Sequence, residues 1–259
     1  MSGSTFKPGD IVVLAQRDNR KKYVIVLGEQ DVYMTVGGFI RARELLGLQP
    51  GSIVKSSAGV EFTALRASPV EELEAFERRS QVIYPKDLAT ISVFLGVRPC
   101  MRMIQSGVGT GYSLAFFARI IGSCGEIIGV DLREDMISVA ESNMGKLGYR
   151  NVKLVHANME EVELEDPPYH TALLDIPNPF KALLNIHRYI EPGGKVAVYL
   201  PTISQVERLR SQLTGSNSYH WLGAYESWMR EWIVSPGKTR PANTPSSHTG
   251  FIVILARLV

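Results

Sequence analysis

Met101-Arg-Met-Ile-Gln-Ser-Gly-Val-Gly-Thr-Gly111 is the stretch that decides the fold. Its first six residues predict a buried strand, and the glycines that follow predict a tight loop whose backbone a ligand can approach closely. Helical spacing resumes over Tyr112–Ile121, and the next apolar strand ends in Asp131, 20 residues after Gly111. An acid at that point can accept hydrogen bonds from both ribose hydroxyls of a nucleoside. Strand, loop, helix and acid in this order predict a site for a nucleoside cofactor.

The spacing of the glycines favours S-adenosylmethionine over a dinucleotide. Dinucleotide-binding folds carry Gly-x-Gly-x-x-Gly, which lets the pyrophosphate rest on the helix N-terminus. Here the third glycine comes one residue earlier, in Gly107-Val-Gly-Thr-Gly111. This form is familiar from S-adenosylmethionine enzymes, whose cofactor carries no phosphate. A glycine-rich loop alone is a weak signal, and the alternative is a loop that only turns the chain.

Apolar strand-like runs alternate with helix-length segments from residue 81 to residue 213. The further strands are expected at Ile127–Asp131, Val152–His156, Ala172–Ile176 and Val196–Leu200, and the further helices at Glu134–Leu147, Pro179–Tyr189 and Gln205–Leu213. Such alternation predicts a parallel sheet covered on both faces. Tyr219–Val234 and Phe251–Leu258 have no helix of normal length between them, and they predict a closing antiparallel pair. The expected fold class is therefore α/β, a Rossmann-like class I methyltransferase sheet with antiparallel closing strands.

The N-terminal part follows a different pattern. Short strands broken by turns predict a small β domain over residues 1–66. The strand signals lie near Ile11, Lys22, Val32, Ser52 and Phe62. A charged, helical stretch over Pro69–Arg79 predicts a connector at residues 67–80, which leaves residues 81–259 for the methyltransferase domain.

Composition limits the class of protein. The 259 residues are 45% hydrophobic and 21% charged with a net charge of +2, which is typical of a soluble globular protein and neither requires nor excludes nucleic acid as a partner. No apolar run approaches the ~20 residues that span a bilayer, and the first residues show no signal peptide. We therefore expect a cytoplasmic protein with no membrane partner. Cys100 and Cys124 make neither a disulfide framework nor a metal site, and we expect two reduced core thiols.

Polar residues follow the third and fourth strands of the expected sheet, at the carboxyl ends where open α/β sheets bind ligands. His156-Ala-Asn158 closes the third strand, where the adenine of the cofactor is expected. Asp175-Ile-Pro-Asn-Pro-Phe180 closes the fourth. Asp175 could instead cap the helix that starts near Pro179, but the rigid Pro-containing segment favours an active-site role.

Several segments together resemble the TrmI family of tRNA adenine-N1 methyltransferases. They are Gln81-Val-Ile-Tyr-Pro-Lys-Asp87, Ser106-Gly-Val-Gly-Thr-Gly111, Val130-Asp-Leu-Arg-Glu-Asp135, Leu174-Asp-Ile-Pro-Asn-Pro-Phe180, Tyr199-Leu-Pro-Thr202 with Gln205-Val206, and Arg240-Pro241 through His248-Thr-Gly-Phe251 to Ala256-Arg257. The resemblance covers nearly the whole chain. It implies methylation of adenosine 58 in the T loop of tRNA, and in archaeal members sometimes of adenosine 57, by a homotetramer.

The resemblance also implies roles for particular residues. Asp175 corresponds to the active-site aspartate, and Tyr84 and Tyr199 correspond to aromatic residues of the substrate pocket. Ordinary packing with a bonded hydroxyl is the alternative for either tyrosine. The expected S-adenosylmethionine contacts are Gln81, Ser106, Gly107, Val108, Gly109, Thr110, Gly111, Ser113, Asp131, Leu132, Asn158, Met159 and Asp175.

The sequence departs from the family at several positions. Gln105, Asn158 and Phe180 stand where the family usually has Glu, Asp and Trp, and Met34-Thr-Val-Gly-Gly38 lacks the histidines usual in the N-terminal domain. Two lost acids would remove negative charge beside a sulfonium, although amides still accept hydrogen bonds.

These departures leave two alternatives to an active tRNA methyltransferase. One is a non-catalytic tRNA-binding scaffold that partners an active relative, and the other is a methyltransferase of the same fold with another substrate. Retention of Asp175 and the three loop glycines favours the enzyme. Basic residues that could meet tRNA phosphates, or could simply be solvated, are Arg17, Arg20, Lys21, Lys22, Arg41, Arg43, Arg230, Lys238 and Arg240.

Overall fold

The computed structural model describes residues 5–16, 21–75, 81–165, 168–242 and 248–259. The chain forms two compact units, residues 1–77 and 78–259, so the boundary falls inside the segment that we predict as a connector. Helix α2 (Pro69–Ala75) belongs to the first unit. The end of the predicted connector helix, residues 76–79, lies outside the described residues, as do Arg17 and Arg20.

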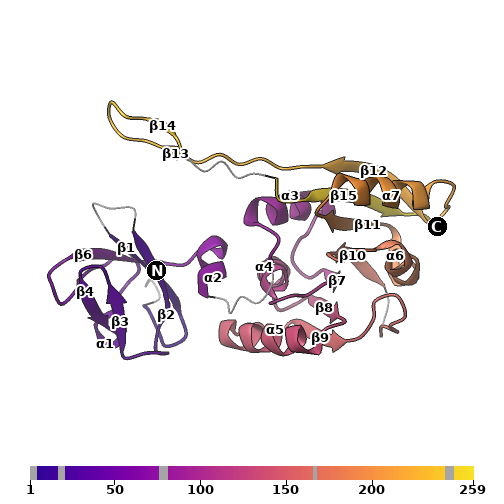
Figure 1. The fold of residues 1–259 in the computed structure, drawn as a ribbon. Helices are drawn as coiled ribbons and strands as arrows, with labels where there is room; N and C mark the ends of the chain where they lie inside the picture. The colour runs from indigo at the N-terminus through magenta and orange to yellow at the C-terminus, as the bar shows by residue number, and fades with distance from the viewer. Residues whose placement is uncertain (1–4, 17–20, 76–80, 166–167, 243–247) are drawn as a thin grey trace. The chain divides into compact units, whose positions relative to one another are not determined.

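The first unit is built from short antiparallel strands (Figure 1). One sheet has the order β2-β1-β6-β5, with β1 at Ile11–Gln16, β2 at Lys22–Val26, β5 at Ile53–Lys55 and β6 at Glu61–Arg66. A separate hairpin of β3 (Val32–Thr35) and β4 (Gly38–Arg41) leads into α1 (Ala42–Leu45). Alternating side chains of β1 and β6 meet Phe6 in the core, where Leu14 and Phe62 are fully buried. The predicted small β domain is confirmed, whereas β4 and α1 were not predicted.

The second unit is a seven-stranded sheet in the order β12-β15-β11-β10-β7-β8-β9. Its strands are β7 (Arg102–Ser106), β8 (Glu126–Asp131), β9 (Val152–His156), β10 (Tyr169–Leu174), β11 (Ile190–Leu200), β12 (Tyr219–Tyr225) and β15 (Phe251–Arg257). The first five are parallel neighbours, and β15 runs antiparallel to both β11 and β12. The predicted fold class is confirmed, because a closing antiparallel pair completes a parallel sheet.

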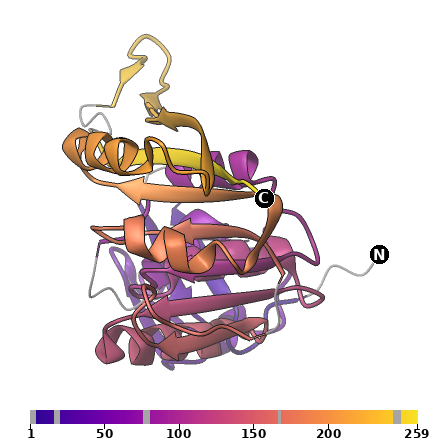
Figure 2. The same ribbon diagram turned by 90° about the vertical axis from the view of Figure 1, so that its right-hand side faces the viewer.

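Helices cover both faces of this sheet (Figures 1 and 2). One side carries α3 (Pro85–Leu95), α4 (Tyr112–Ile121) and α5 (Glu134–Leu147), and the other carries α6 (Phe180–Ile186) and α7 (Ile203–Leu213). Buried strand residues such as Val130, Leu174 and Val198 pack against α6 and α7 in one apolar core. Burial on both faces explains why the central strands are continuous apolar runs.

The C-terminal part differs from the prediction in two ways. The predicted strand Tyr219–Val234 ends at Tyr225, and the chain then forms a separate small hairpin of β13 (Trp232–Ile233) and β14 (Arg240–Pro241). Helix α3 was not predicted, although Pro85 at its first turn and Gly96 at its C-cap, in the left-handed conformation, are ordinary helix boundaries.

The expectation of two reduced core cysteines is wrong. Cys100 and Cys124 are exposed and form a disulfide across a sequence separation of 24 residues. Cys100 lies just before β7 and Cys124 just before β8, and the starts of neighbouring parallel strands lie side by side. The Cys100 N–H donates to the Ile121 carbonyl at 2.9 Å, which brings the two segments together.

Among the described residues, none belongs to a helix long and apolar enough to cross a membrane.

Candidate active site

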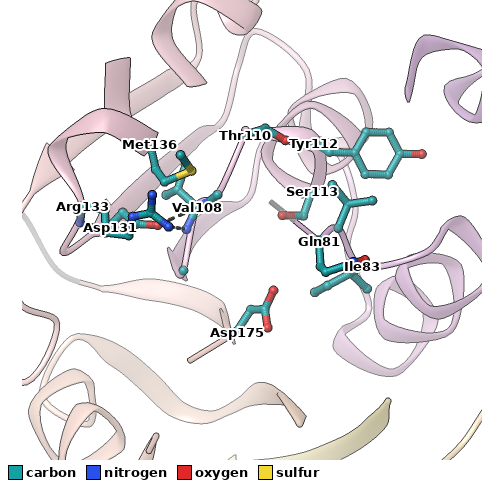
Figure 3. A pocket seen from close by; sticks show the side chains of 13 residues that line it. Gln81, Ile83, Val108, Thr110, Tyr112, Ser113, Asp131, Arg133, Met136 and Asp175 are labelled. Carbon is teal, nitrogen blue, oxygen red and sulfur yellow. Dashed lines mark hydrogen bonds between the residues drawn. The ribbon is translucent and has the colours of Figure 1, made fainter. Parts of the chain in front are cut away.

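A cavity of about 310 Å³ opens where β7, β8 and β10 end. This is the edge at which open α/β sheets bind ligands. Figure 3 shows side chains from the segment before α3, the glycine loop and the strand ends around it. The lining residues are Gln81, Val82, Ile83, Gly107, Val108, Gly109, Thr110, Tyr112, Ser113, Asp131, Arg133, Met136 and Asp175. All of them belong to the second unit.

Asp131 holds the glycine loop in place. Its Oδ2 accepts hydrogen bonds from the Val108 and Gly109 N–H groups at 2.8 and 3.1 Å, and its Oδ1 accepts from the Arg133 N–H at 3.0 Å. A carboxylate offers about four lone-pair sites, so one remains free for a ligand hydroxyl. Asp131 therefore shapes the loop and can still accept a ligand hydrogen bond.

Gly107 is required by the close approach of two strand ends. It has a φ of +76°, and a Cβ there would collide with the carbonyl oxygen of Asp175. The Gly107 N–H donates to the Val130 carbonyl at 3.0 Å, and the Asp175 N–H donates to the Ser106 carbonyl at 2.9 Å. The loop and the acid of β10 are thus fixed to each other through the backbone.

The Asp175 side chain points into the cavity (Figure 3). Among the described residues none donates a hydrogen bond to its carboxylate. Burial, and then the nearby charge of Asp131, raise the pKa of Asp175 to about 7. The alternative role as a helix cap is not observed, since α6 begins at Phe180 with Pro179 as its N-cap and has no side-chain cap hydrogen bond. A carboxyl group with such a pKa is able to interact strongly with a cationic ligand.

Most of the predicted cofactor residues line the cavity, and five do not. Ser106 and Met159 are buried at 2% and 3% exposure, Gly111 is the N-cap of α4, Leu132 points outward at 69% exposure, and Asn158 lies beyond β9. Sequence reasoning missed Val82, Ile83, Tyr112, Arg133 and Met136. In the sequence, Val82, Ile83 and Tyr112 are direct neighbours of predicted residues. Arg133 follows Asp131 by two positions, whereas no sequence pattern indicated Met136.

Two of the departures from the family have local structural roles. Gln105 is fully buried and donates from Nε2 to Ser113 Oγ at 2.6 Å, while its Oε1 has no partner among the described residues. The Asn158 Oδ1 accepts from the Glu160 N–H at 3.0 Å and stabilises the turn after β9. Gln105 thus supports the helix that carries Ser113 but does not itself line the cavity.

The two predicted pocket tyrosines differ in exposure. Tyr84 is the N-cap of α3 and is 50% exposed. Tyr199 on β11 is only 7% exposed, and its hydroxyl donates to Asp87 Oδ2 at 3.2 Å. Burial is the main reason that the pKa of Tyr199 lies above its usual value. Neither ring lines the cavity, so their contact with a substrate stays a prediction.

Comparison with known proteins identifies the family. The family described as methyltransferase domain matches residues 98–234. The chain is 30% identical over 251 residues to a Thermus thermophilus protein named tRNA (adenine(58)-N(1))-methyltransferase TrmI, and the match covers 96% of this chain and 97% of that protein. This chain belongs to the TrmI family of methyltransferases. A Methanocaldococcus jannaschii TrmI named for adenines 57 and 58 is 23% identical, with 92% of each chain covered.

Two solved structures have the same architecture from end to end. The TrmI structure from Aquifex aeolicus superposes with a TM-score of 0.84 at 26% identity, over 99% of this chain and 100% of that one. A Thermotoga maritima structure described as an S-adenosylmethionine-dependent O-methyltransferase gives a TM-score of 0.88 at 28% identity, over 98% of this chain and 95% of that one. The TrmI family fold thus includes the N-terminal β unit, but proteins with this fold carry names for different acceptor atoms.

Proposed function

We propose that this TrmI-family chain transfers a methyl group from S-adenosylmethionine to N1 of adenosine 58 in the T loop of tRNA, with the adjacent adenosine 57 as a second position to test. The observation that carries the proposal is Asp175, whose carboxylate lies in the cavity beside the glycine loop and accepts no hydrogen bond from the described residues. The TrmI names of relatives matched along nearly the whole chain support the tRNA substrate.

The cavity residues fit S-adenosylmethionine. Gln81, Thr110, Ser113 and Asp131 supply polar groups for the ribose and the amino-acid part of the cofactor, and the Thr110 Oγ1 has no partner among the described residues. Asp175 supplies negative charge, while the lining cation Arg133 is paired with Asp135 at 2.6 Å. Among the described lining residues, two acids and one cation that is already paired suit a positively charged ligand better than a phosphate.

The chemistry requires little more than positioning and charge. When bound, S-adenosylmethionine supplies an electrophilic methyl group on a sulfonium. The neutral N1 of adenine has a free lone pair, so no strong base is needed for an in-line displacement. Asp175 can accept a hydrogen bond from the 6-amino group, orient the ring and oppose the positive charge that the ring gains. Tyr84, which is half exposed and follows the lining residue Ile83, can stack on a base that has left its helix.

The remaining parts of the proposal concern partners. Residues 1–66 and the basic residues Lys21, Lys22, Arg41 and Arg43 are proposed to bind tRNA in the cytoplasm, with affinity that falls steeply with salt. The chain is proposed to form a homotetramer. Exposed apolar side chains on and near the β13–β14 hairpin support a contact between copies: Trp228 at 68%, Met229 at 64%, Trp232 at 54% and Val234 at 75% exposure.

The decisive experiment incubates the protein with methyl-labelled S-adenosylmethionine and unmodified tRNA, and then analyses the nucleosides. Label in 1-methyladenosine is expected, and it should disappear from transcripts in which adenosines 57 and 58 are both replaced by guanosine. Label on another base or only on protein would support a different substrate for the same fold. An inactive protein that binds tRNA and an active relative would support the scaffold alternative.

A further inference from the structure

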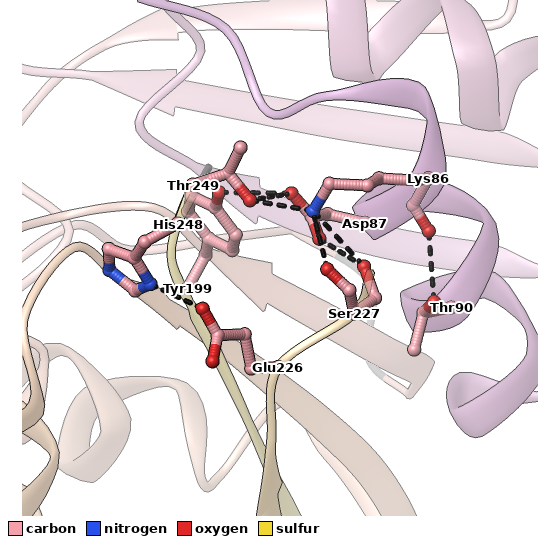
Figure 4. Close-up of polar contacts among 8 residues, drawn as sticks. All are labelled: Lys86, Asp87, Thr90, Tyr199, Glu226, Ser227, His248 and Thr249. Carbon is pink, nitrogen blue, oxygen red and sulfur yellow. Dashed lines mark hydrogen bonds and ion pairs between the residues drawn. The ribbon is translucent and has the colours of Figure 1, made fainter. Parts of the chain in front are cut away.

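A buried polar cluster lies on the α3 side of the β11 strand end (Figure 4). Lys86 and Asp87 begin α3, Tyr199 lies near the end of β11, and Ser227 and Thr249 flank the segment that carries the β13–β14 hairpin. Asp87 is fully buried, and the Lys86 side chain is only 7% exposed. A buried ion pair at this place needs an explanation, because taking two charges out of water is costly.

Asp87 uses all of its hydrogen-bonding capacity within the cluster. Its Oδ1 accepts from Lys86 Nζ at 2.8 Å and from the Ser227 hydroxyl. Its Oδ2 accepts from the Thr249 hydroxyl at 2.8 Å and from the Tyr199 hydroxyl at 3.2 Å. One of these four donors is the neighbouring Lys86 and the other three come from distant parts of the chain, and together they match the four lone-pair sites of a carboxylate.

Lys86 completes the cluster. In addition to Asp87, its Nζ donates to the Ser227 carbonyl at 2.8 Å and to Thr249 Oγ1 at 2.7 Å. An ammonium has three donors, and all three are used. A fully satisfied network of this kind favours one arrangement of the segments that it joins, because any shift leaves a buried polar group unpaired.

One of those segments is a wall of the candidate active site. Gln81, Val82 and Ile83 line the cavity but belong to neither a helix nor a strand. The wall continues through Tyr84, whose carbonyl accepts from the Asp87 N–H at 2.9 Å, into the first turn of α3. Lys86, the first residue of the cluster, follows the wall residue Ile83 by three positions in the sequence.

We propose that the Lys86–Asp87 pair positions the cofactor cavity. By joining the start of α3 to Tyr199, Ser227 and Thr249, the pair fixes the Gln81–Ile83 wall relative to the strand ends that carry the glycine loop and Asp175. The inference rests on the proposed cofactor but not on the proposed tRNA substrate. Lys86 and Asp87 are positioning residues here, since neither lines the cavity.

The chain offers a matched control in a neighbouring pair. His248 and Glu226 join the same two segments, with Nδ1 of His248 2.6 Å from Glu226 Oε1 and Nε2 donating to the Pro201 carbonyl at 2.7 Å. This pair forms no hydrogen bond with the described residues 81–87. Glu226→Gln therefore removes the charge of this second pair and leaves the hydrogen bonds of the Lys86–Asp87 cluster in place.

The test measures the dissociation constant of S-adenosylhomocysteine by calorimetry, together with the melting temperature, for the full-length protein and its variants. We expect binding to weaken at least tenfold in Asp87→Asn, which leaves the buried charge of Lys86 without a counter-charge, and about threefold in Ser227→Ala and Thr249→Val. Glu226→Gln should stay within twofold of wild type. Unchanged affinity in Asp87→Asn, or in both milder variants if Asp87→Asn does not fold, would overturn the proposal.

A double variant, Lys86→Met with Asp87→Leu, separates positioning from stability. Apolar replacement removes the buried charge that Asp87→Asn leaves without a counter-charge, so the melting temperature should rise above that of Asp87→Asn while cofactor binding stays weak. Recovery of both would show that the cluster acts only on stability and would overturn the proposal. Wild-type protein that binds S-adenosylhomocysteine but methylates no tRNA would contradict the proposed substrate, while the variant affinities would still decide this inference.

Discussion

The candidate site has two halves: the glycine loop with the strand ends, and the Gln81–Ile83 segment before α3. The hydrogen bonds that hold each half in place span very different distances in the sequence. On the cofactor half, Asp131 binds the backbone of Val108 and Gly109, which lie 23 and 22 residues before it. On the Gln81–Ile83 half, the positioning residue Asp87 accepts hydrogen bonds from Tyr199, Ser227 and Thr249, which lie 112, 140 and 162 residues after it. The first half is encoded within one strand-loop-helix-strand unit, whereas the second exists only when the complete sheet has formed.

The largest expected effect is on turnover and comes from Asp175, which lines the cavity together with residues of both halves. Asp175→Ala should fold and bind S-adenosylhomocysteine nearly normally but lower turnover by about 100-fold or more, in line with the loss of one preorganised electrostatic group. Steady-state kinetics with unmodified tRNA measure the effect on kcat separately from KM. Asp175→Asn keeps the shape without the charge, and retention of wild-type turnover in the alanine variant would remove Asp175 from the mechanism.

A somewhat smaller effect is expected on the cofactor half. Asp131→Ala removes two hydrogen bonds to the loop and the acceptor proposed for the ribose, so the dissociation constant for S-adenosylhomocysteine should rise by roughly 10- to 100-fold. Asp135→Ala is the matched control, because Asp135 also contacts Arg133 but does not bind the loop. Equal affinities in the two variants would mean that the loop does not depend on Asp131.

The smallest effect on the site is expected from the disulfide. Cys100 and Cys124 lie at the starts of β7 and β8, at the opposite ends of these strands from the cavity. The paired change Cys100→Ser with Cys124→Ser should reduce stability by about 3.5 kcal/mol, the chain-entropy value for a loop of this length. The melting temperature should fall by several degrees, while the cofactor dissociation constant stays within twofold. A large loss of cofactor affinity would contradict the expectation that the disulfide end of the sheet does not influence the cavity at the other end.

Local patterns explain what could be predicted from the sequence. The glycine loop, Asp131 and Asp175 follow apolar strands, and the side chain after a parallel strand lies at the binding edge wherever the sheet forms. Gln105 could not be placed correctly, because whether it faces the ligand or Ser113 depends on side-chain packing.

Long-range features could not be predicted. The disulfide follows from the strand order, which places the starts of β7 and β8 side by side. The buried environment of Tyr199 follows from α3 and the segments around the β13–β14 hairpin, which meet only in the folded unit. Polar residues such as Lys86 and Asp87 near a helix start are usually exposed, so no local pattern marks them as buried.

The most direct test of the central claim is the pH dependence of cofactor binding. The claim is that the sulfonium of S-adenosylmethionine lies beside Asp175, whose pKa is raised to about 7 in the free protein. A sulfonium favours the ionised carboxylate, so binding should lower this pKa and release a proton below pH 7. S-adenosylhomocysteine carries the same amino-acid group but a neutral thioether, which gives no such gain.

Calorimetry between pH 5.5 and 8.5 would measure both ligands, with Asp175→Asn as the control. We predict that affinity for S-adenosylmethionine rises about tenfold relative to S-adenosylhomocysteine as the pH rises from about 6 to about 7, since lowering the pKa by one unit corresponds to a tenfold change in affinity. The difference should vanish in Asp175→Asn. Parallel pH profiles for the two ligands in the wild-type protein would contradict the placement of the methyl donor beside Asp175.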